Sequence, residues 1–215
     1  NGLMAAQQKI YGYYFIEEIL PDFIINDFKN HFSGFYTAPE ESFCTDRNTL
    51  AQLYLGTEIS ARERVAAMKT LGSHFSVDLY TGSNTQGIPV RNKGLAKTLT
   101  EMPLIFHYSK INLNITAKSI RTGIPLRIFD ILGCGGFCLT NYQAELADYF
   151  TIGSDLECYT CEEELLEKCE YYLKHEDERS KIANHGYETI KQYYNYPERL
   201  LQMLSLAYEL KEEKL

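Results

Sequence analysis

The stretch SIRTGIPLRIFDILGCGGFCLTNYQAEL, residues 119–146, decides the fold class of this chain. A turn marked by Gly123 and Pro125 precedes an amphipathic segment, which predicts a helix over 125–133. The Gly-Cys-Gly-Gly run at 133–136 indicates the end of that helix rather than a phosphate loop, because a short apolar strand follows it over 137–140. A further helix is expected over 143–150. This alternation is typical of an α/β protein with a parallel sheet and helices on both faces.

The turn before the helix has the properties of an anion site. A glycine turn that leads into a helix N-terminus presents free backbone N–H groups, here around Gly123 and Ile124. Arg121 and Arg127 flank the turn, and Asp130 follows one helical turn later. The combination suits a nucleoside diphosphate, with amides and guanidinium groups on the phosphates and a carboxylate on sugar hydroxyls.

An ordinary helix start would explain some of the same residues. Thr122 is a candidate N-cap, and Pro125 suits the first helical turn. For Arg127, the alternative to a phosphate contact is a salt bridge to a nearby carboxylate.

Four motifs in the right order carry a resemblance to a known family. They are SKINLN at 109–114, TGIPLRIFD at 122–130, CGGFCLTN at 134–141 and YNYPER at 194–199. From about Met102 to Arg199, the chain resembles the CgeB-like (spore maturation protein-like) glycosyltransferases, a branch of the GT-B group 1 superfamily. The resemblance implies a Rossmann-like domain, the C-terminal half of a GT-B enzyme, which binds a nucleoside diphosphate sugar for transfer to an unknown acceptor. It implies no cofactor and no metal.

The resemblance also implies roles for two residues. In the superfamily, an E-x7-E motif spans this turn and helix, and its second Glu holds the donor ribose. Asp130 corresponds to that second Glu, one methylene shorter. Thr122 stands where the first Glu would be, close to the transferred sugar, so the catalytic residues remain unknown.

Further donor-binding candidates come from the neighbouring elements. Lys110 opens an expected strand over 110–115 and is placed to reach a phosphate or solvent. Asn114 alternates with Asn112 on one face of that strand, where each could contact the donor or satisfy backbone groups. Tyr142 and Glu145 follow the next strand, at the carboxyl edge where ligands bind, although Glu145 could equally cap its own helix.

The rest of the sequence predicts a helical N-terminal segment, residues 1–56, and a Rossmann-like domain with C-terminal helices, residues 57–215. The N-terminal segment is interpreted as interdomain or as a remnant of a missing domain. A Ser60–Glu63 capping box is expected to open a helix. The other expected elements are helices over 3–20, 22–32, 60–71, 101–109, 162–174, 176–193 and 197–213, strands over 75–80 and 156–159, and loops over 33–48 and 81–87.

Composition limits the partners. Residues 131–215 carry 17 acidic and 8 basic side chains, which argues against nucleic acid or an anionic membrane as the main partner. No apolar run is long enough to span a membrane. Cys158 and Cys161 form a C-x-x-C, but no second pair has zinc spacing, so free thiols in the cytoplasm are expected.

The length supplies about one of the two domains of a GT-B enzyme. We therefore expect an isolated fragment to lack activity and to form a homodimer through its terminal helices. One alternative is a non-catalytic nucleotide-binding or protein-interaction module of the same fold. Another is an unrelated flavodoxin-like signalling domain, which would need an acidic pocket or flavin loop at the strand ends.

Overall fold

The fold is built around a small parallel sheet. A computed structural model describes residues 1–37, 39 and 41–208. Strands β3 (Asn112–Asn114), β4 (Cys138–Asn141) and β5 (Glu157–Tyr159) form a parallel sheet in the order β3-β4-β5. The register pairs Asn114 with Thr140, and Thr140 with Cys158. The predicted Rossmann-like α/β architecture is confirmed at this level.

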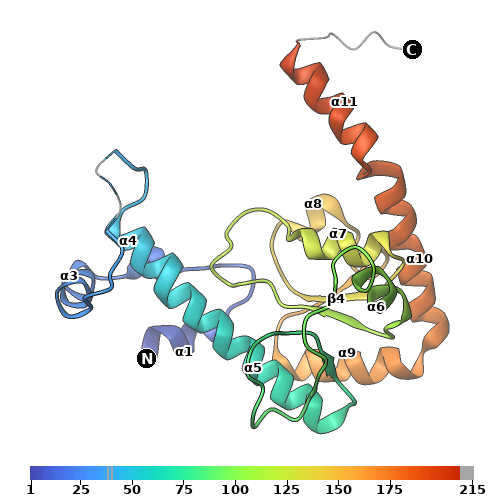
Figure 1. Ribbon diagram of the computed structural model, residues 1–215, viewed down its shortest axis with the longest axis horizontal. Helices are drawn as coiled ribbons and strands as arrows, with labels where there is room; N and C mark the ends of the chain where they lie inside the picture. The colour runs from blue at the N-terminus through green and yellow to red at the C-terminus, as the bar shows by residue number, and fades with distance from the viewer. Residues whose placement is uncertain (38, 40, 209–215) are drawn as a thin grey trace.

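Helices cover both faces of this sheet (Figure 1). Helices α5 (Thr57–His74) and α9 (Glu162–Lys174) contact each other on one side. Helix α7 (Leu126–Gly133) contacts β3 and β4 on the other, and α10 (Glu176–Tyr193) packs against α7 and α9.

The strand side chains alternate between two apolar clusters, as the period of a strand requires. Leu139 and Tyr159 pack in the cluster that includes Leu71 of α5. Cys138 and Cys158 pack in the cluster that includes Ile131 and Leu132 of α7. The sheet is therefore buried on both faces, which is typical of parallel sheets.

The strand expected over 75–80 takes a different place. Within this range only Asp78–Leu79 forms a strand (β1), and it pairs in parallel with β2 (Arg91–Asn92) in a separate two-stranded sheet. The prediction did not include β2. Both of its residues are exposed, so the hydrophobic pattern gave no signal there.

The sequence predicted the C-terminal end of α7 correctly but not the residue that caps its N-terminus. At its C-terminus, the Gly136 amide donates to Ile131 O at 3.0 Å and the Gly135 amide to Leu132 O at 2.9 Å, which is a Schellman motif with Gly135 at φ +72°. The predicted helix stop is confirmed. At the N-terminus, the predicted Thr122 cap is wrong: Pro125 occupies the N-cap position, and no side chain caps the helix.

The N-terminal region is less regular than predicted. The helix expected over 3–20 is divided into α1 (Gly2–Gln8) and α2 (Ile16–Ile19), because Gly12 turns the chain at φ +77°. Helix α3 (Asp22–His31) follows as predicted.

One long helical run then joins this region to the sheet (Figure 1). It comprises α4 (Asp46–Asn48), the π-helical segment η1 (Thr49–Gly56) and α5. The capping box that opens it is formed by Thr45 and Asn48. The predicted box at Ser60 is wrong: the Ser60 hydroxyl lies inside the run and donates to Gly56 O at 2.6 Å.

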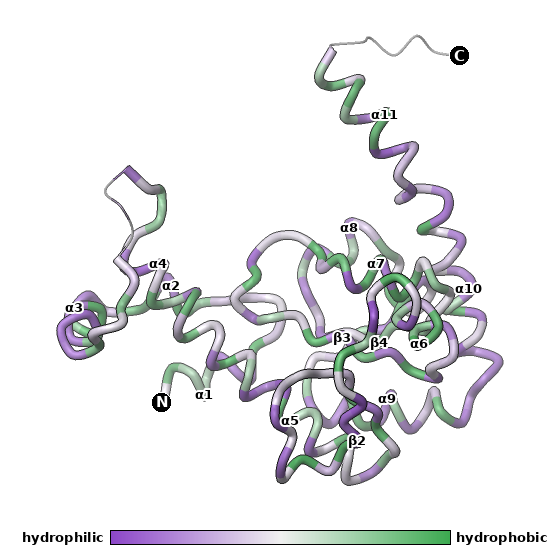
Figure 2. Tube along the Cα trace, in the orientation of Figure 1, coloured by the Kyte–Doolittle hydropathy of each residue, from purple (hydrophilic) through white to green (hydrophobic). Residues whose placement is uncertain are grey.

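Three further helices complete the described part of the chain. Helices α6 (Met102–Tyr108) and α8 (Leu146–Tyr149) flank α7. Helix α11 (Tyr196–Ala207) projects away from the sheet, and apolar residues recur along it (Figures 1 and 2). The final residues of the helix predicted over 197–213 lie outside the described residues. No described helix combines the length and apolar character that crossing a membrane requires.

Candidate functional site

A narrow pocket lies at the carboxyl ends of β3 and β4. In parallel α/β sheets, ligands bind at this edge, where loops from neighbouring strands diverge. Its walls are the N-terminal residues 10–13, the β3–α7 loop and the β4–α8 loop, and we call it the strand-end pocket. The lining residues are Ile10, Tyr11, Gly12, Tyr13, Thr116, Ala117, Lys118, Ile120, Arg121, Gly123, Asn141, Tyr142, Gln143, Ala144 and Glu145.

A buried side-chain amide joins the two loops. The Thr116 backbone amide donates to Asn141 Oδ1 at 2.8 Å, and Asn141 Nδ2 donates to Thr116 O at 2.9 Å. Asn141 thus satisfies both backbone groups of Thr116, as a neighbouring strand would do. This pairing fixes where the β3–α7 loop leaves the sheet.

Lys118 and Glu63 form a buried charged pair beside the pocket. Lys118 Nζ lies 3.9 Å from Glu63 Oε1, and both side chains are at least nine-tenths buried. Burial lowers the pKa of Lys118 to about 8, against the opposing attraction of Glu63. Burial likewise raises the pKa of Glu63, and the charge of Lys118 opposes that rise. Neither carboxylate oxygen of Glu63 has a hydrogen-bond partner among the described residues.

The predicted phosphate turn is held by a carboxylate. The Gly123 amide donates to Glu145 Oε2 at 2.6 Å, and Gly123 has φ +89°. Arg121, just before it, extends toward the N-terminal region and lies 3.6 Å from Glu17 and 3.4 Å from Glu18. The pocket therefore gathers a lysine, an arginine and a glycine amide within six consecutive residues.

Comparison with known proteins identifies the family of the chain. Residues 60–205 match the family model described as glycosyl transferase-like. The chain belongs to the glycosyl transferase-like family. No curated protein sequence matches the chain. The family match spans the whole three-stranded sheet and both loops of the strand-end pocket, and it supports a transferase that moves a sugar from a donor to an acceptor.

The pocket brings together three of the nine residues predicted to bind the donor of this glycosyl transferase-like protein: Gly123, Tyr142 and Glu145. Thr122 and Ile124 adjoin Gly123 in the chain but do not line the pocket, and Ile124 packs against the α7 cluster.

The other four predicted residues lie elsewhere. Lys110 is exposed before β3, at the amino edge of the sheet and thus opposite to the pocket. Asn114 is buried, and its Nδ2 donates to the hydroxyls of Thr116 and Thr140 at 2.9 Å each. Asp130 is half exposed on α7, 3.9 Å from Arg127.

Arg127 faces α6 rather than the pocket. Its guanidinium lies 5.3 Å from the centre of the Phe106 ring and 3.6 Å from the sulfur of Met102. The salt-bridge alternative noted for Arg127 is therefore present, with Asp130 as the carboxylate. Any contact with the donor would require this side chain to turn.

The site prediction missed Lys118, Asn141 and Glu63. A signal for Lys118 was available: Asn112, Asn114, Thr116 and Lys118 alternate, and all four are buried. The prediction used only the first two of these polar positions. Glu63 gave no comparable signal, because it lies on α5, far from the loop in sequence.

A second polar cluster, on α10, resembles a catalytic triad but lacks its geometry. His185 Nδ1 lies 2.6 Å from Asp155 Oδ1 and 3.4 Å from the Ser154 hydroxyl. A triad needs the serine and the aspartate on opposite ring nitrogens, whereas here both contact the same one. Asp155 also accepts from Thr189 at 2.7 Å and from the Thr151 amide at 2.7 Å, so the cluster anchors the 151–155 loop to α10.

No three His, Cys, Asp or Glu side chains within the described residues are arranged to hold a metal ion.

Proposed function

We propose that this chain is the donor-binding part of a CgeB-like glycosyltransferase of the GT-B type. In this proposal, a nucleoside diphosphate sugar binds at the strand-end pocket, and its sugar is transferred to an acceptor held largely by a second, N-terminal domain. Free cysteines support a reducing compartment such as the cytoplasm.

One observation carries the proposal: the β3–α7 loop places Lys118 and Arg121 at the carboxyl edge of the sheet, next to the Gly123 turn. Sugar transfer leaves a diphosphate on which negative charge develops. Fixed cations and amide dipoles stabilise such charge, and this is usually the largest contribution to catalysis. Membership of the glycosyl transferase-like family agrees with that chemistry.

The residues around the pocket supply neutral contacts as well. Tyr142 presents a ring at the pocket, and Asn141 and Gln143 present amides. The resemblance assigns the ribose to Asp130, one helical turn into α7. A donor that extends from the Gly123 turn along the exposed face of α7 would pass both Thr122 and Asp130.

The proposal is tested by the binding of nucleotides to the purified chain. Uridine, guanosine and adenosine diphosphates and their sugar derivatives are screened for an increase in unfolding temperature. A ligand present at 100 times its Kd adds about 2.7 kcal/mol to the free energy of unfolding. If none stabilises the chain, the proposal is wrong.

Two variants locate the ligand. Arg121→Ala should weaken the best ligand by about 1.5–3 kcal/mol, the range for a hydrogen bond to a charged group. Lys174→Ala is the matched control, because Lys174 ends α9, which begins at the carboxyl edge of the sheet and runs away from it. Equal losses in both variants would indicate non-specific attraction of the anion.

The alternative is a non-catalytic nucleotide-binding module. Thr122 favours the non-catalytic module, because the resemblance implies a Glu at this position, close to the transferred sugar. Nucleotide binding without turnover of any nucleotide sugar, measured with the second domain present, would favour the module over the enzyme.

A further inference from the structure

The N-terminal segment that walls the strand-end pocket also occupies its cations. We call residues 8–18 the strap. Gly12, at the middle of the strap, lies against Tyr142: a Cβ atom at Gly12 would come within 2.7 Å of the Tyr142 ring. The strap is thus in direct contact with the β4–α8 loop of the pocket.

Strap carbonyls hold Lys118. Its Nζ donates to Gln8 O at 2.7 Å and to Ile10 O at 3.0 Å, and lies 3.4 Å from the centre of the Tyr11 ring. A lysine ammonium has three donor hydrogens and no acceptor. Two of the three are used by the strap.

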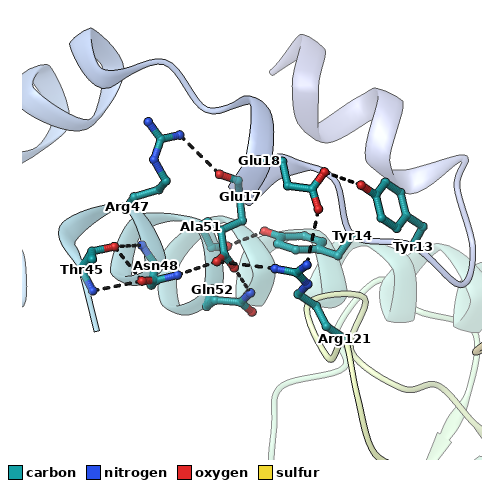
Figure 3. Close-up of polar contacts among 10 residues, drawn as sticks. All are labelled: Tyr13, Tyr14, Glu17, Glu18, Thr45, Arg47, Asn48, Ala51, Gln52 and Arg121. Atoms are coloured by element: carbon teal, nitrogen blue, oxygen red, sulfur yellow. Dashed lines mark hydrogen bonds and ion pairs between the residues drawn. The ribbon is translucent and has the colours of Figure 1, made fainter. Parts of the chain in front are cut away.

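Strap carboxylates hold Arg121 (Figure 3). The guanidinium lies 3.6 Å from Glu17 and 3.4 Å from Glu18, and the Tyr13 hydroxyl donates to the other oxygen of Glu18. Glu18 is thus fixed from two sides. Two adjacent carboxylates on one arginine are the same kind of partner as the oxygens of a diphosphate.

The strap is itself tied to the long helical run. Glu17 accepts from Asn48 Nδ2 and from Gln52 Nε2, each at 2.5 Å, and the Tyr14 hydroxyl donates to Ala51 O. These contacts form around a buried core of Tyr14, Ile16 and Leu50. The carboxylates therefore stand at a defined place beside Arg121 rather than on a loose tail.

We propose that the strap is a built-in competitor of the anionic ligand: Glu17, Glu18 and the Gln8 and Ile10 carbonyls occupy Arg121 and Lys118, and a diphosphate binds by displacing them. The identity of the ligand rests on the proposed function. The competition itself does not rest on the proposed function, because it follows from the strap groups that contact Lys118 and Arg121 in the structure.

The test uses inorganic pyrophosphate and uridine diphosphate with the full chain. In Glu17→Gln/Glu18→Gln, the carboxylates lose their charge and keep their shape, so calorimetry should give a Kd about tenfold lower than in the unchanged chain. Glu18→Gln alone, at an exposed position, leaves the Glu17 contacts with Asn48 and Gln52 in place and should show part of the gain. The single variant keeps the test valid if the double variant fails to fold.

The control is Glu163→Gln/Glu167→Gln on α9. It removes the same two charges at exposed positions that have no ion-pair partner in the described part of the chain. A comparable gain in this control would mean that overall charge, not the strap, sets the affinity, and would overturn the inference.

Hydrogen exchange provides the second readout. Saturating pyrophosphate should accelerate exchange of the amides in residues 8–18, because these residues leave the cations. Binding with an unchanged Kd in the strap variants and unchanged exchange would overturn the competition and leave the proposed function standing. If neither the unchanged chain nor the variants bind either probe, the competition is wrong, and the screen of the three nucleoside diphosphates and their sugars decides the proposed function separately.

Discussion

Lys118 Nζ lies 3.9 Å from Glu63 Oε1, and both side chains are buried. Lys118 comes from the β3–α7 loop and Glu63 comes from α5, so the pair joins the pocket loop to α5. The first two predictions concern this pair.

Removing only the lysine should be costly. Lys118→Met leaves the Glu63 carboxylate buried without its compensating charge, which should lower the free energy of unfolding by about 3–5 kcal/mol. Lys118→Met/Glu63→Gln should be more stable than the single variant, because no uncompensated charge remains. Urea unfolding of the four proteins in a double-mutant cycle measures the coupling; additive losses would show that the two charges do not interact.

Stability should rise with pH in a window set by Lys118. Burial lowers its pKa in the folded chain to about 8, from 10.5 in the unfolded chain. Between these values, the unfolded chain binds a proton that the folded chain does not, so the free energy of unfolding rises with pH. From pH 7 to 9.5, the gain should be about 2 kcal/mol. Lys118→Met should lack this component, and an identical pH profile in both proteins would contradict the assignment.

Gly136 should not tolerate a side chain. A Cβ atom there would lie 2.5 Å from Phe106 O and 2.7 Å from Asn112 Nδ2. Gly136→Ala should therefore lower the free energy of unfolding by about 1–3 kcal/mol, the range for overpacking. Gly133→Ala is the control: the nearest atom would be Ile190 Cγ2 at 3.6 Å, so this change should be neutral or stabilising. Chemical denaturation of both variants distinguishes the two positions.

Helix α11 should promote self-association. Its exposed apolar side chains include Leu200, Leu201, Met203, Leu204 and Leu206. An exposed apolar surface of this kind tends to be buried against another protein surface, here a second copy of the chain. Sedimentation equilibrium should detect a homodimer that Leu200→Glu/Leu204→Glu weakens at least tenfold. Gln202→Glu/Ser205→Glu adds the same charge at the polar positions and should weaken it less. A chain that stays monomeric at high micromolar concentration would contradict this prediction.

Local signals predicted much of the fold. Helices α9 and α10 begin and end where the sequence pattern predicted, and the glycines after α7 gave its end correctly. These features depend on residues close together in the chain. Gly12 was a local sign of the break between α1 and α2 that the prediction did not use. The strand β2 depends on pairing with β1, and its exposed residues carried no sign of it.

The site was predicted less completely for the same reason. Tyr142 and Glu145, chosen by the rule that ligands bind at strand ends, and Gly123, chosen from the glycine turn, line the strand-end pocket; their binding of a donor stays a prediction. Lys110 was chosen for its charge although it precedes its strand, which places it at the opposite edge. The contacts of Lys118 and Arg121 with the strap join segments about a hundred residues apart, and no local pattern encodes such pairs.

The unbroken helical run from Asp46 to His74 has a mechanical consequence. Asn48 and Gln52, which hold Glu17, lie near one end of it, and Glu63 lies roughly 20 Å further along. The π-helical segment Thr49–Gly56 lies within this run, where it contains Gln52 and precedes Glu63. Asn48 and Gln52, which bind Glu17, and Glu63, which pairs with Lys118, therefore belong to one run, so a displacement of that run near Asp46 would move the partners of both carboxylate contacts together.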